Sequence, residues 1–171
     1  MPQTTPSATS PCPCGSGRDY ADCCQPHHLD ERPPATPEAL MRSRYSAFAL
    51  GNLGYYLYHT WDPDTRDTAL TPELLDRRDC DWLGLEILES RVRGSQGTVT
   101  FKAHYRPLNP APSAATEAKA VLHERSRFRR RQGRWRYLDG EIDPTPASAS
   151  PQRNAPCPCG SGKKAKRCCH P

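Results

Sequence analysis

One cysteine-rich stretch occurs twice in this chain, and it limits the structures that the two ends can form. Each copy reads C-P-C-G-S-G and is followed, after five further residues, by two adjacent cysteines. The two copies contain eight of the nine cysteines, namely Cys12, Cys14, Cys23, Cys24, Cys157, Cys159, Cys168 and Cys169. Four thiolates in so short a stretch are typical of a tetrahedral metal site. We therefore expect a zinc knuckle at each end and two zinc ions per chain.

Disulfide bonds and an iron–sulfur cluster are the alternatives for four clustered cysteines. Disulfide bonds tie distant segments together, whereas each set here is compact, and a bridge between the adjacent Cys23 and Cys24 would be strained. The sequence also starts without the apolar segment of a secretory signal, which favours the reducing cytoplasm as its location. Any set of four thiolates can also bind an iron–sulfur cluster, so this alternative stays open. The tight spacing suits a closed site for one zinc ion better.

The residues between the ligands favour a sharp reversal of the backbone. Gly15 and Gly17 can adopt positive φ at little steric cost, and the hydroxyl of Ser16 can bond a nearby amide. We expect residues 18–22 and 163–167 to form a helical turn that presents the final pair of cysteines in each copy.

The two copies differ in the charge of their flanks. The chain has a formal net charge of +5, and the C-terminal copy carries a basic cluster made of Lys163, Lys164, Lys166 and Arg167. These side chains could neutralise the charge of about −2 on a tetrathiolate zinc site. They could equally bind nucleic-acid phosphates or an acidic protein surface. Both explanations stay open, and the second makes these four residues the expected partner-binding site.

Between the two copies, residues 30–143 change from helical to alternating hydrophobic periodicity. Proline and capping signals predict three helices, over residues 37–50, 53–59 and 72–79, with Asn52 as the cap of the second. No apolar run approaches the roughly 18 residues that a membrane helix needs, so we expect no membrane insertion.

Alternating periodicity then predicts an antiparallel sheet. The first strand has Leu83, Leu85 and Ile87 on its apolar face, and the second has Val99, Phe101, Ala103 and Tyr105. A hairpin at residues 94–97 joins them, a long strand follows over about residues 117–131, and a turn at residues 132–133 leads to a strand over residues 135–138. The predicted fold class is α+β, with helices packed on a curved antiparallel sheet and a small zinc knuckle on either side.

The predicted domain boundaries follow from these patterns and from composition. We expect an N-terminal knuckle (1–29), an α+β domain (30–143), a linker rich in proline, alanine and serine (144–152) and a basic C-terminal knuckle (153–171).

Six segments give the chain a recognisable family pattern. They are M-R-S-R-Y-S-A-F at 41–48, T-W-D-P at 60–63, W-L-G-L at 82–85, E-R-S-R-F at 124–128, Y-L-D-G at 137–140 and N-A-P-C-P-C-G-S-G-K-K at 154–164. With them the chain resembles the bacterial YchJ family over most of its length, and its cysteine stretches resemble the SEC-C motif. The resemblance implies the cone-shaped, cystatin-like fold that nuclear transport factor two and ketosteroid isomerase share.

The SEC-C motif also forms the tail of the translocation motor SecA. That tail binds zinc, the export chaperone SecB and the ribosome, so the resemblance implies zinc and a protein or ribosomal partner. The final ligand of the SecA motif is a histidine, where this chain has Cys24 and Cys169. The exchange keeps a zinc site and makes it more negative.

A cone-shaped domain can enclose a ligand pocket. The residues predicted to line it are Tyr45, Tyr56, Trp61, Trp82, Glu124 and Arg44. Each also has a structural explanation: the tyrosines have the helical spacing of core residues, the tryptophans can plug the end of the cone, and Glu124 can pair with Arg42 or Arg44. No residue is assigned a catalytic role. Cys80 is expected to be a small buried residue, since no histidine is placed to activate it.

Three functions stay open. The leading one is a cytoplasmic zinc-binding adaptor whose knuckles, above all the C-terminal one, dock to a protein or ribosomal partner. The second is an enzyme or small-molecule binder that uses the pocket. The third is an RNA or ribosome binder that works by charge, to which a strand face with His123, Arg125 and Arg127 would add a basic sheet surface.

Overall fold

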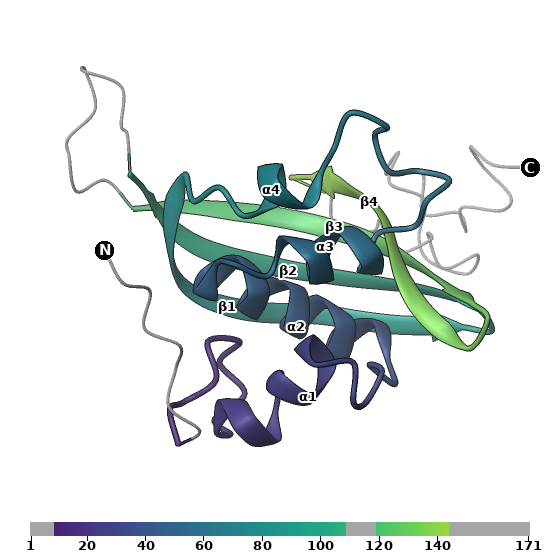
Figure 1. The fold of residues 1–171 in the computed structure, drawn as a ribbon, viewed down its shortest axis with the longest axis horizontal. Helices are drawn as coiled ribbons and strands as arrows, with labels where there is room; N and C mark the ends of the chain where they lie inside the picture. The colour runs from purple at the N-terminus through teal and green to yellow at the C-terminus, as the bar shows by residue number, and fades with distance from the viewer. Residues whose placement is uncertain (1–8, 109–118, 144–171) are drawn as a thin grey trace, which may run out of the picture.

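The computed structural model describes residues 9–108 and 119–143 (Figure 1). A 3₁₀ turn η1 (Tyr20–Asp22) comes first, followed by α1 (Gln25–His28), α2 (Pro37–Leu50), α3 (Gly54–Thr60), α4 (Pro72–Leu75), β1 (Cys80–Arg93), β2 (Gln96–Pro107), β3 (Ala120–Arg131) and β4 (Arg134–Ile142). The predicted linker (144–152) and C-terminal knuckle (153–171), with all the residues assigned to them, lie outside the described residues.

The four strands form one antiparallel sheet in the order β1-β2-β3-β4. Figure 1 shows the sheet as a curved layer with α2 and α3 across one face. We call the face that packs against α2 the inner face and the opposite one the outer face. The predicted α+β class, with helices on one side of a curved antiparallel sheet, is confirmed.

Helix α2 begins and ends where its sequence signals predict. The side chain of Thr36 accepts a hydrogen bond from the Ala39 amide at 3.1 Å, and Pro37 occupies the first helical position. Gly51 ends the helix with φ of 73°, which glycine adopts without a steric penalty. On the inner side of α2, Leu40 is fully buried against a core that includes Val99, Phe101, Phe128 and Trp135.

Two helix predictions need correction. Asn52 does not cap α3, because it adopts a left-handed conformation with φ of 56° and Leu53 precedes the first helical residue. The amide of Gly54 instead donates to Oδ1 of Asp76 at 2.6 Å, so α4 supplies the acceptor that the start of α3 needs. Helix α4 itself ends at Leu75 rather than near Asp79.

The strand predictions also shift in detail. A register irregularity between Trp82 and Gly84 removes Leu83 from the inner face and leaves it 44% exposed, so it does not join the core with Leu85 as predicted. The first hairpin turn is also shorter than predicted. Gly94 and Ser95 form it, and the next residue, Gln96, already belongs to β2. Strand β3 starts at residue 120 rather than about 117, and β4 extends beyond 138 to 142.

Within the described ranges, no helix combines the length and the apolar character that crossing a membrane requires.

Candidate functional site

The first cysteine set forms a compact cluster of sulfur atoms. One ligand atom from each of four residues lies within 4.8 Å of the others, and all four side chains are buried: Cys12, Cys14, Cys23 and Cys24. The Sγ atoms of Cys14 and Cys23 are 3.6 Å apart, and those of Cys23 and Cys24 are 3.9 Å apart. A tetrahedral site with metal–sulfur bonds of about 2.3 Å has edges of about 3.8 Å. The cluster therefore has the dimensions of a tetrathiolate metal site.

The glycine-rich turn produces this geometry. Gly15 and Gly17 have φ of 70° and 76°, so both occupy the left-handed region that other residues rarely adopt. The amide of Cys12 donates to the Arg18 carbonyl at 2.9 Å, which closes the loop between the first two cysteines and the last two. Turn η1 then presents the final pair, as the sequence predicts.

The cluster holds more potential negative charge than a buried site can keep without a cation. Hydrogen bonds with Cys12 and then Cys24 lower the pKa of the Cys14 thiol, while hydrogen bonds with Cys12 and then Cys14 raise the pKa of Cys24. One thiol therefore ionises easily at the expense of its neighbours. A divalent cation would let all four ionise together, because its charge offsets their repulsion.

Polar side chains surround the sulfur atoms. Nη2 of Arg18 donates to Sγ of Cys23 at 3.4 Å, and Oγ of Ser16 lies 3.1 Å from the same sulfur. Ser46, fully buried on α2, donates its hydroxyl to Sγ of Cys24 at 3.4 Å and lies 3.5 Å from Sγ of Cys12. Such partners orient thiolate ligands and partly balance their charge.

The N-terminal module, residues 9–28, is fixed to α2 by partly buried hydrogen bonds. Nη1 of Arg42 donates to the carbonyl of Cys14 at 2.9 Å. Nε2 of His28 lies 2.8 Å from the carbonyl of Ser43, and its Nδ1 lies 2.6 Å from the hydroxyl of Tyr20. The cysteines and Tyr20 consequently belong to the same buried cluster as the core of the sheet.

His28 is a structural residue and not a metal ligand. Both of its ring nitrogens have partners outside the sulfur cluster, so neither is available to replace a cysteine. Burial lowers its pKa to about 4, so the ring is neutral at pH 7. In a neutral ring, Nε2 donates a hydrogen bond to the Ser43 carbonyl, and Nδ1 accepts one from the Tyr20 hydroxyl.

A second candidate site is a cavity of about 270 Å³ between α2 and the inner face of the sheet. Its lining is mostly apolar and aromatic and consists of Met41, Arg44, Tyr45, Phe48, Trp61, Trp82, Phe101, Ala103, Leu122, Glu124, Ser126 and Tyr137. Five of the six residues predicted to line a pocket lie here together. The sixth, Tyr56, does not, and its hydroxyl lies 2.6 Å from Oγ of Ser43 on the other side of α2.

Arg44 places a buried positive charge at this cavity. Its side chain is 4% exposed, and its Nη1 donates to the Leu57 carbonyl and to Oγ1 of Thr60, both at 2.7 Å. Its Cζ lies 4.7 Å from the ring centre of Tyr137 and 5.6 Å from that of Trp61. Burial lowers its pKa to about 10, so the group stays charged at neutral pH.

Glu124 faces the same cavity but does not form the predicted ion pair with Arg42 or Arg44. Its Oε1 accepts hydrogen bonds from Ser126 at 2.6 Å and Tyr137 at 3.4 Å, whereas Arg42 pairs with Glu38. Among the described residues, no hydrogen bond reaches Oε2 of Glu124. The prediction failed because α2 turns Arg42 toward the cysteine module and Arg44 toward α3.

Sequence reasoning missed two residues that shape these sites. Tyr137, whose ring stacks beside Arg44, lies on a strand where sequence alone shows no preference for one face. Ser46 has the small size typical of close helix packing, but only the docked module makes it a partner of two cysteines. Cys80 is half-buried rather than fully buried as expected, and burial, followed by the charges of Asp79 and Asp81, raises the pKa of its thiol.

Comparison with known proteins identifies the chain. The family profile described as the middle NTF2-like domain of YchJ matches residues 36–140. The chain belongs to the YchJ family. The SEC-C motif matches residues 9–26 and 153–171, which contain the two cysteine sets.

Relatives in the YchJ family extend over nearly the whole chain. A UPF0225 protein of Serratia proteamaculans is 42% identical over 161 residues, covering 92% of this chain and 96% of the relative. A UPF0225 protein of Sodalis glossinidius is 44% identical over 163 residues, covering 94% and 97%.

Two solved structures share the fold. The solution structure of a SEC-C motif containing protein from Rhodopseudomonas palustris is 40% identical, with a TM-score of 0.67, and covers 77% of this chain and 98% of its own. The crystal structure of a SEC-C motif containing protein from Psychrobacter arcticus is 30% identical, with a TM-score of 0.63, and covers 95% and 96%. The YchJ-family fold, an NTF2-like domain accompanied by SEC-C motifs, therefore describes this chain.

Proposed function

We propose that this protein is a cytoplasmic zinc-binding adaptor whose two SEC-C motifs have different roles. The observation that supports this most directly is the buried tetrathiolate cluster, with sulfur spacings of 3.6 and 3.9 Å, held against α2 of the NTF2-like domain. Zinc fits this donor set because it favours four thiolates in a tetrahedron and closed structural sites. Bound there, it would fix the N-terminal module to the domain.

The C-terminal motif is the proposed docking element. It repeats the ligand spacing but adds Lys163, Lys164, Lys166 and Arg167, where the first copy has Arg18 balanced by Asp19 and Asp22. In the first copy Arg18 is already used on a cysteine sulfur. Four basic residues exceed that requirement, which leaves charge to contact an acidic protein or a ribosomal surface.

Affinity capture from a bacterial cytosol tests the adaptor role. The full chain is compared with Cys157→Ser/Cys159→Ser, which removes the second site, and with a variant carrying glutamine at the four basic positions. We expect both variants to lose the same partner while their melting temperatures stay at the wild-type value. Capture of an identical set of partners by all three proteins would contradict the proposal.

The cavity supports a second candidate function, the binding of a small aromatic ligand. A volume of about 270 Å³ lies just below the usual range for ligand pockets, and its walls carry aromatic side chains together with Arg44 and Glu124. A planar ligand with a hydrogen-bond donor would fill the cavity and use the carboxylate oxygen that takes no bond from the described residues.

Ligand-observed NMR with a library of small aromatic amines and phenols tests this function, with intrinsic tryptophan fluorescence, to which Trp61 and Trp82 of the cavity contribute, as a second readout. We expect Glu124→Gln to weaken binding at least about tenfold, because a charged acceptor is lost. Val121→Gln, on the outer face, serves as the control. The absence of any hit that Glu124→Gln weakens would exclude the cavity as a ligand site.

A further inference from the structure

The end of the sheet that carries both hairpin turns concentrates arginines on its outer face and along its β4 edge, where Arg134 and Arg136 contact Asp30 and the His59 carbonyl on the helix side. Strand register places Arg91, Thr98 and Arg127 in one row across β1, β2 and β3. The next row toward the turns is Arg93, Gln96, Arg129 and Arg136, and a last pair joins Arg131 to Arg134. Directly paired residues share a face of a sheet, and the neighbouring Phe128 points into the core. We call these seven arginines, Arg91, Arg93, Arg127, Arg129, Arg131, Arg134 and Arg136, the hairpin-end surface.

Acidic neighbours balance only part of this charge. Five of the arginines form ion pairs, which are Arg91–Glu89, Arg127–Asp139, Arg129–Asp62, Arg131–Asp64 and Arg134–Asp30. Within residues 9–108 and 119–143, neither Arg93 nor Arg136 has an ion pair, and the guanidinium of Arg136 donates to the His59 carbonyl. The surface therefore keeps a positive surplus after its local pairs are counted.

In two places an arginine of β3 lies directly opposite an arginine of β4. Arg129 faces Arg136 and Arg131 faces Arg134 in the strand register. Like charges in direct opposition destabilise an antiparallel pair. Burial lowers the pKa of Arg136, and the nearby Arg134 lowers it further, which shows the crowding of positive charge. An anion bound across the hairpin would relieve this repulsion.

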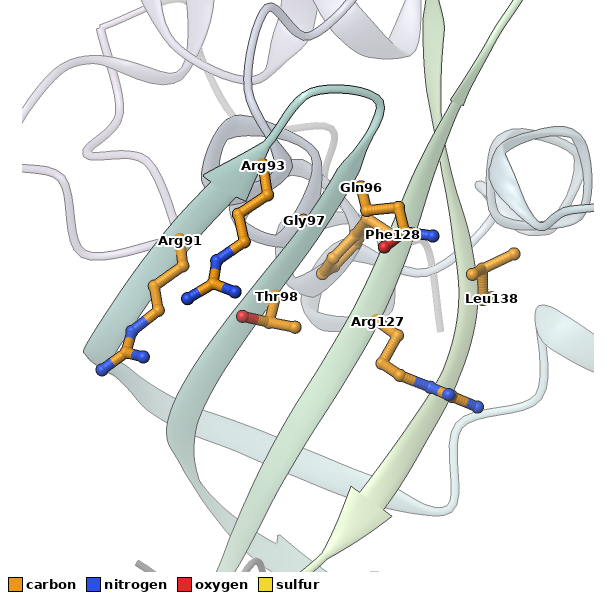
Figure 2. Close-up of a pocket in the computed structure, with 8 residues that line it drawn as sticks. All are labelled: Arg91, Arg93, Gln96, Gly97, Thr98, Arg127, Phe128 and Leu138. Atoms are coloured by element: carbon orange, nitrogen blue, oxygen red, sulfur yellow. The ribbon is translucent and has the colours of Figure 1, made fainter. Parts of the chain in front are cut away.

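A donor-lined hollow of about 400 Å³ lies on the same surface (Figure 2). Figure 2 shows the guanidinium group of Arg93 beside Thr98, with Arg91 farther along the same strand as Arg93 and with Arg127 directed toward the strand of Leu138. Gln96 adds an amide to the rim, and no acidic side chain lines the hollow. Guanidinium groups, an amide and a hydroxyl are the donors that phosphate oxygens accept from in nucleic-acid complexes.

We propose that the hairpin-end surface binds the phosphate backbone of a nucleic acid. Adjacent strands lie about 4.8 Å apart, so the arginine rows reach across some 14 Å, a span that fits several successive phosphates better than one small anion. No aromatic side chain belongs to the arginine rows themselves, so recognition by these rows would follow the backbone rather than the sequence. None of the seven arginines belongs to either cysteine motif in the sequence, and this inference does not depend on the adaptor role.

Fluorescence anisotropy with a labelled oligouridylate of about 20 nucleotides tests the proposal on the full chain. Arg93→Gln/Arg136→Gln removes the two arginines without acidic partners. Arg77→Gln/Arg106→Gln makes the same change in net charge at the opposite end of the sheet. We expect the first variant to lose affinity about tenfold and to flatten the slope of log affinity against log salt by about 1.4, equal to two phosphate contacts. The control should keep the wild-type slope.

Further variants and competitors show whether the oligonucleotide binds to the hairpin-end surface or elsewhere. A third variant, with glutamine at Lys163, Lys164, Lys166 and Arg167, measures what the C-terminal cluster contributes. If that variant abolishes binding while Arg93→Gln/Arg136→Gln has no effect, the proposal is wrong. Equal losses in the test and control pairs, or no binding at about 50 mM salt, would also overturn it. Polyglutamate that competes as well as the oligouridylate would overturn the assignment to nucleic acid, whereas competition by unlabelled RNA or duplex DNA alone supports it.

Discussion

At the scale of single residues, Gly140 shows how one missing side chain shapes the cavity. The side chain of Glu124 occupies the space that a Cβ at Gly140 would need. Gly140→Ala should displace Glu124 from its bond with Ser126 and destabilise the fold by about 1–3 kcal/mol. Gly84→Ala, on β1, is the matched control, because a Cβ added there would meet no atom within 4 Å. Chemical denaturation of both variants is the measurement, and equal stability of the two would contradict the expected contact.

His28 gives a pH dependence whose sign follows from its burial. Its folded pKa of about 4 lies below the ordinary 6.5, so between these values the unfolded chain binds a proton that the folded protein excludes. The free energy of unfolding is therefore unaffected by His28 above about pH 6.5. It falls as the pH drops toward 4, by no more than about 3 kcal/mol, because protonation of His28 favours the unfolded chain.

The measurement compares wild type with His28→Gln in denaturant melts from about pH 7 to about pH 5. We expect the wild type to lose more stability over this interval than the variant does, although the variant starts lower because it loses buried bonds. Protonation of the cysteine cluster affects both proteins and cancels in the difference. His104→Gln, on β2, should follow the wild-type curve, and parallel curves for wild type and His28→Gln would refute the assignment.

At the scale of elements, the N-terminal module and α2 behave as one unit. The cysteine sulfurs, Tyr20 and Leu40 share a buried cluster, and Ser46 connects α2 to two of the sulfurs. Cys14→Ser should therefore weaken metal binding and lower the stability of the whole domain, by about 3 kcal/mol when free zinc is a hundredfold above its dissociation constant.

Cys80→Ser provides the control for that experiment. Cys80 is the ninth cysteine, lies half-buried on β1 and takes no part in the cluster. We expect it to keep the zinc content of the wild type and to change the melting temperature far less than Cys14→Ser does. Loss of metal without any loss of stability in Cys14→Ser would show that the module does not support α2.

The element predictions succeeded where a local interaction decides the conformation. Thr36, Pro37 and Gly51 set the ends of α2 through a side-chain cap, a fixed φ and a left-handed residue, all of which act within a few positions. Leu83 and Asn52 failed for the opposite reason. The irregularity at Leu83 arises from pairing with a strand about twenty residues away, and the start of α3 uses Asp76, the residue that follows α4.

At the scale of the whole molecule, the two SEC-C motifs are expected to differ in what their metal does. The full chain should contain about two zinc ions per molecule when measured by mass spectrometry after careful purification. Cys12→Ser/Cys14→Ser and Cys157→Ser/Cys159→Ser should each retain one. Only the first should lower the melting temperature, because the first set lies within the core of the domain and the second is proposed to act in docking. Equal destabilisation by both would contradict this division.

The sequence by itself determined the first cysteine cluster, the α+β class and the ends of α2, because these depend on spacing and on interactions between near neighbours. From the sequence we also predicted five pocket residues that do line one cavity in the structure: Arg44, Tyr45, Trp61, Trp82 and Glu124. Only the tertiary structure decided that Tyr56 lies outside it and that Arg42 serves the cysteine module. Only strand register decided that the arginines of β1, β3 and β4 meet at one end of the sheet. Packing and register join residues that are far apart in the chain, and no local preference carries that information.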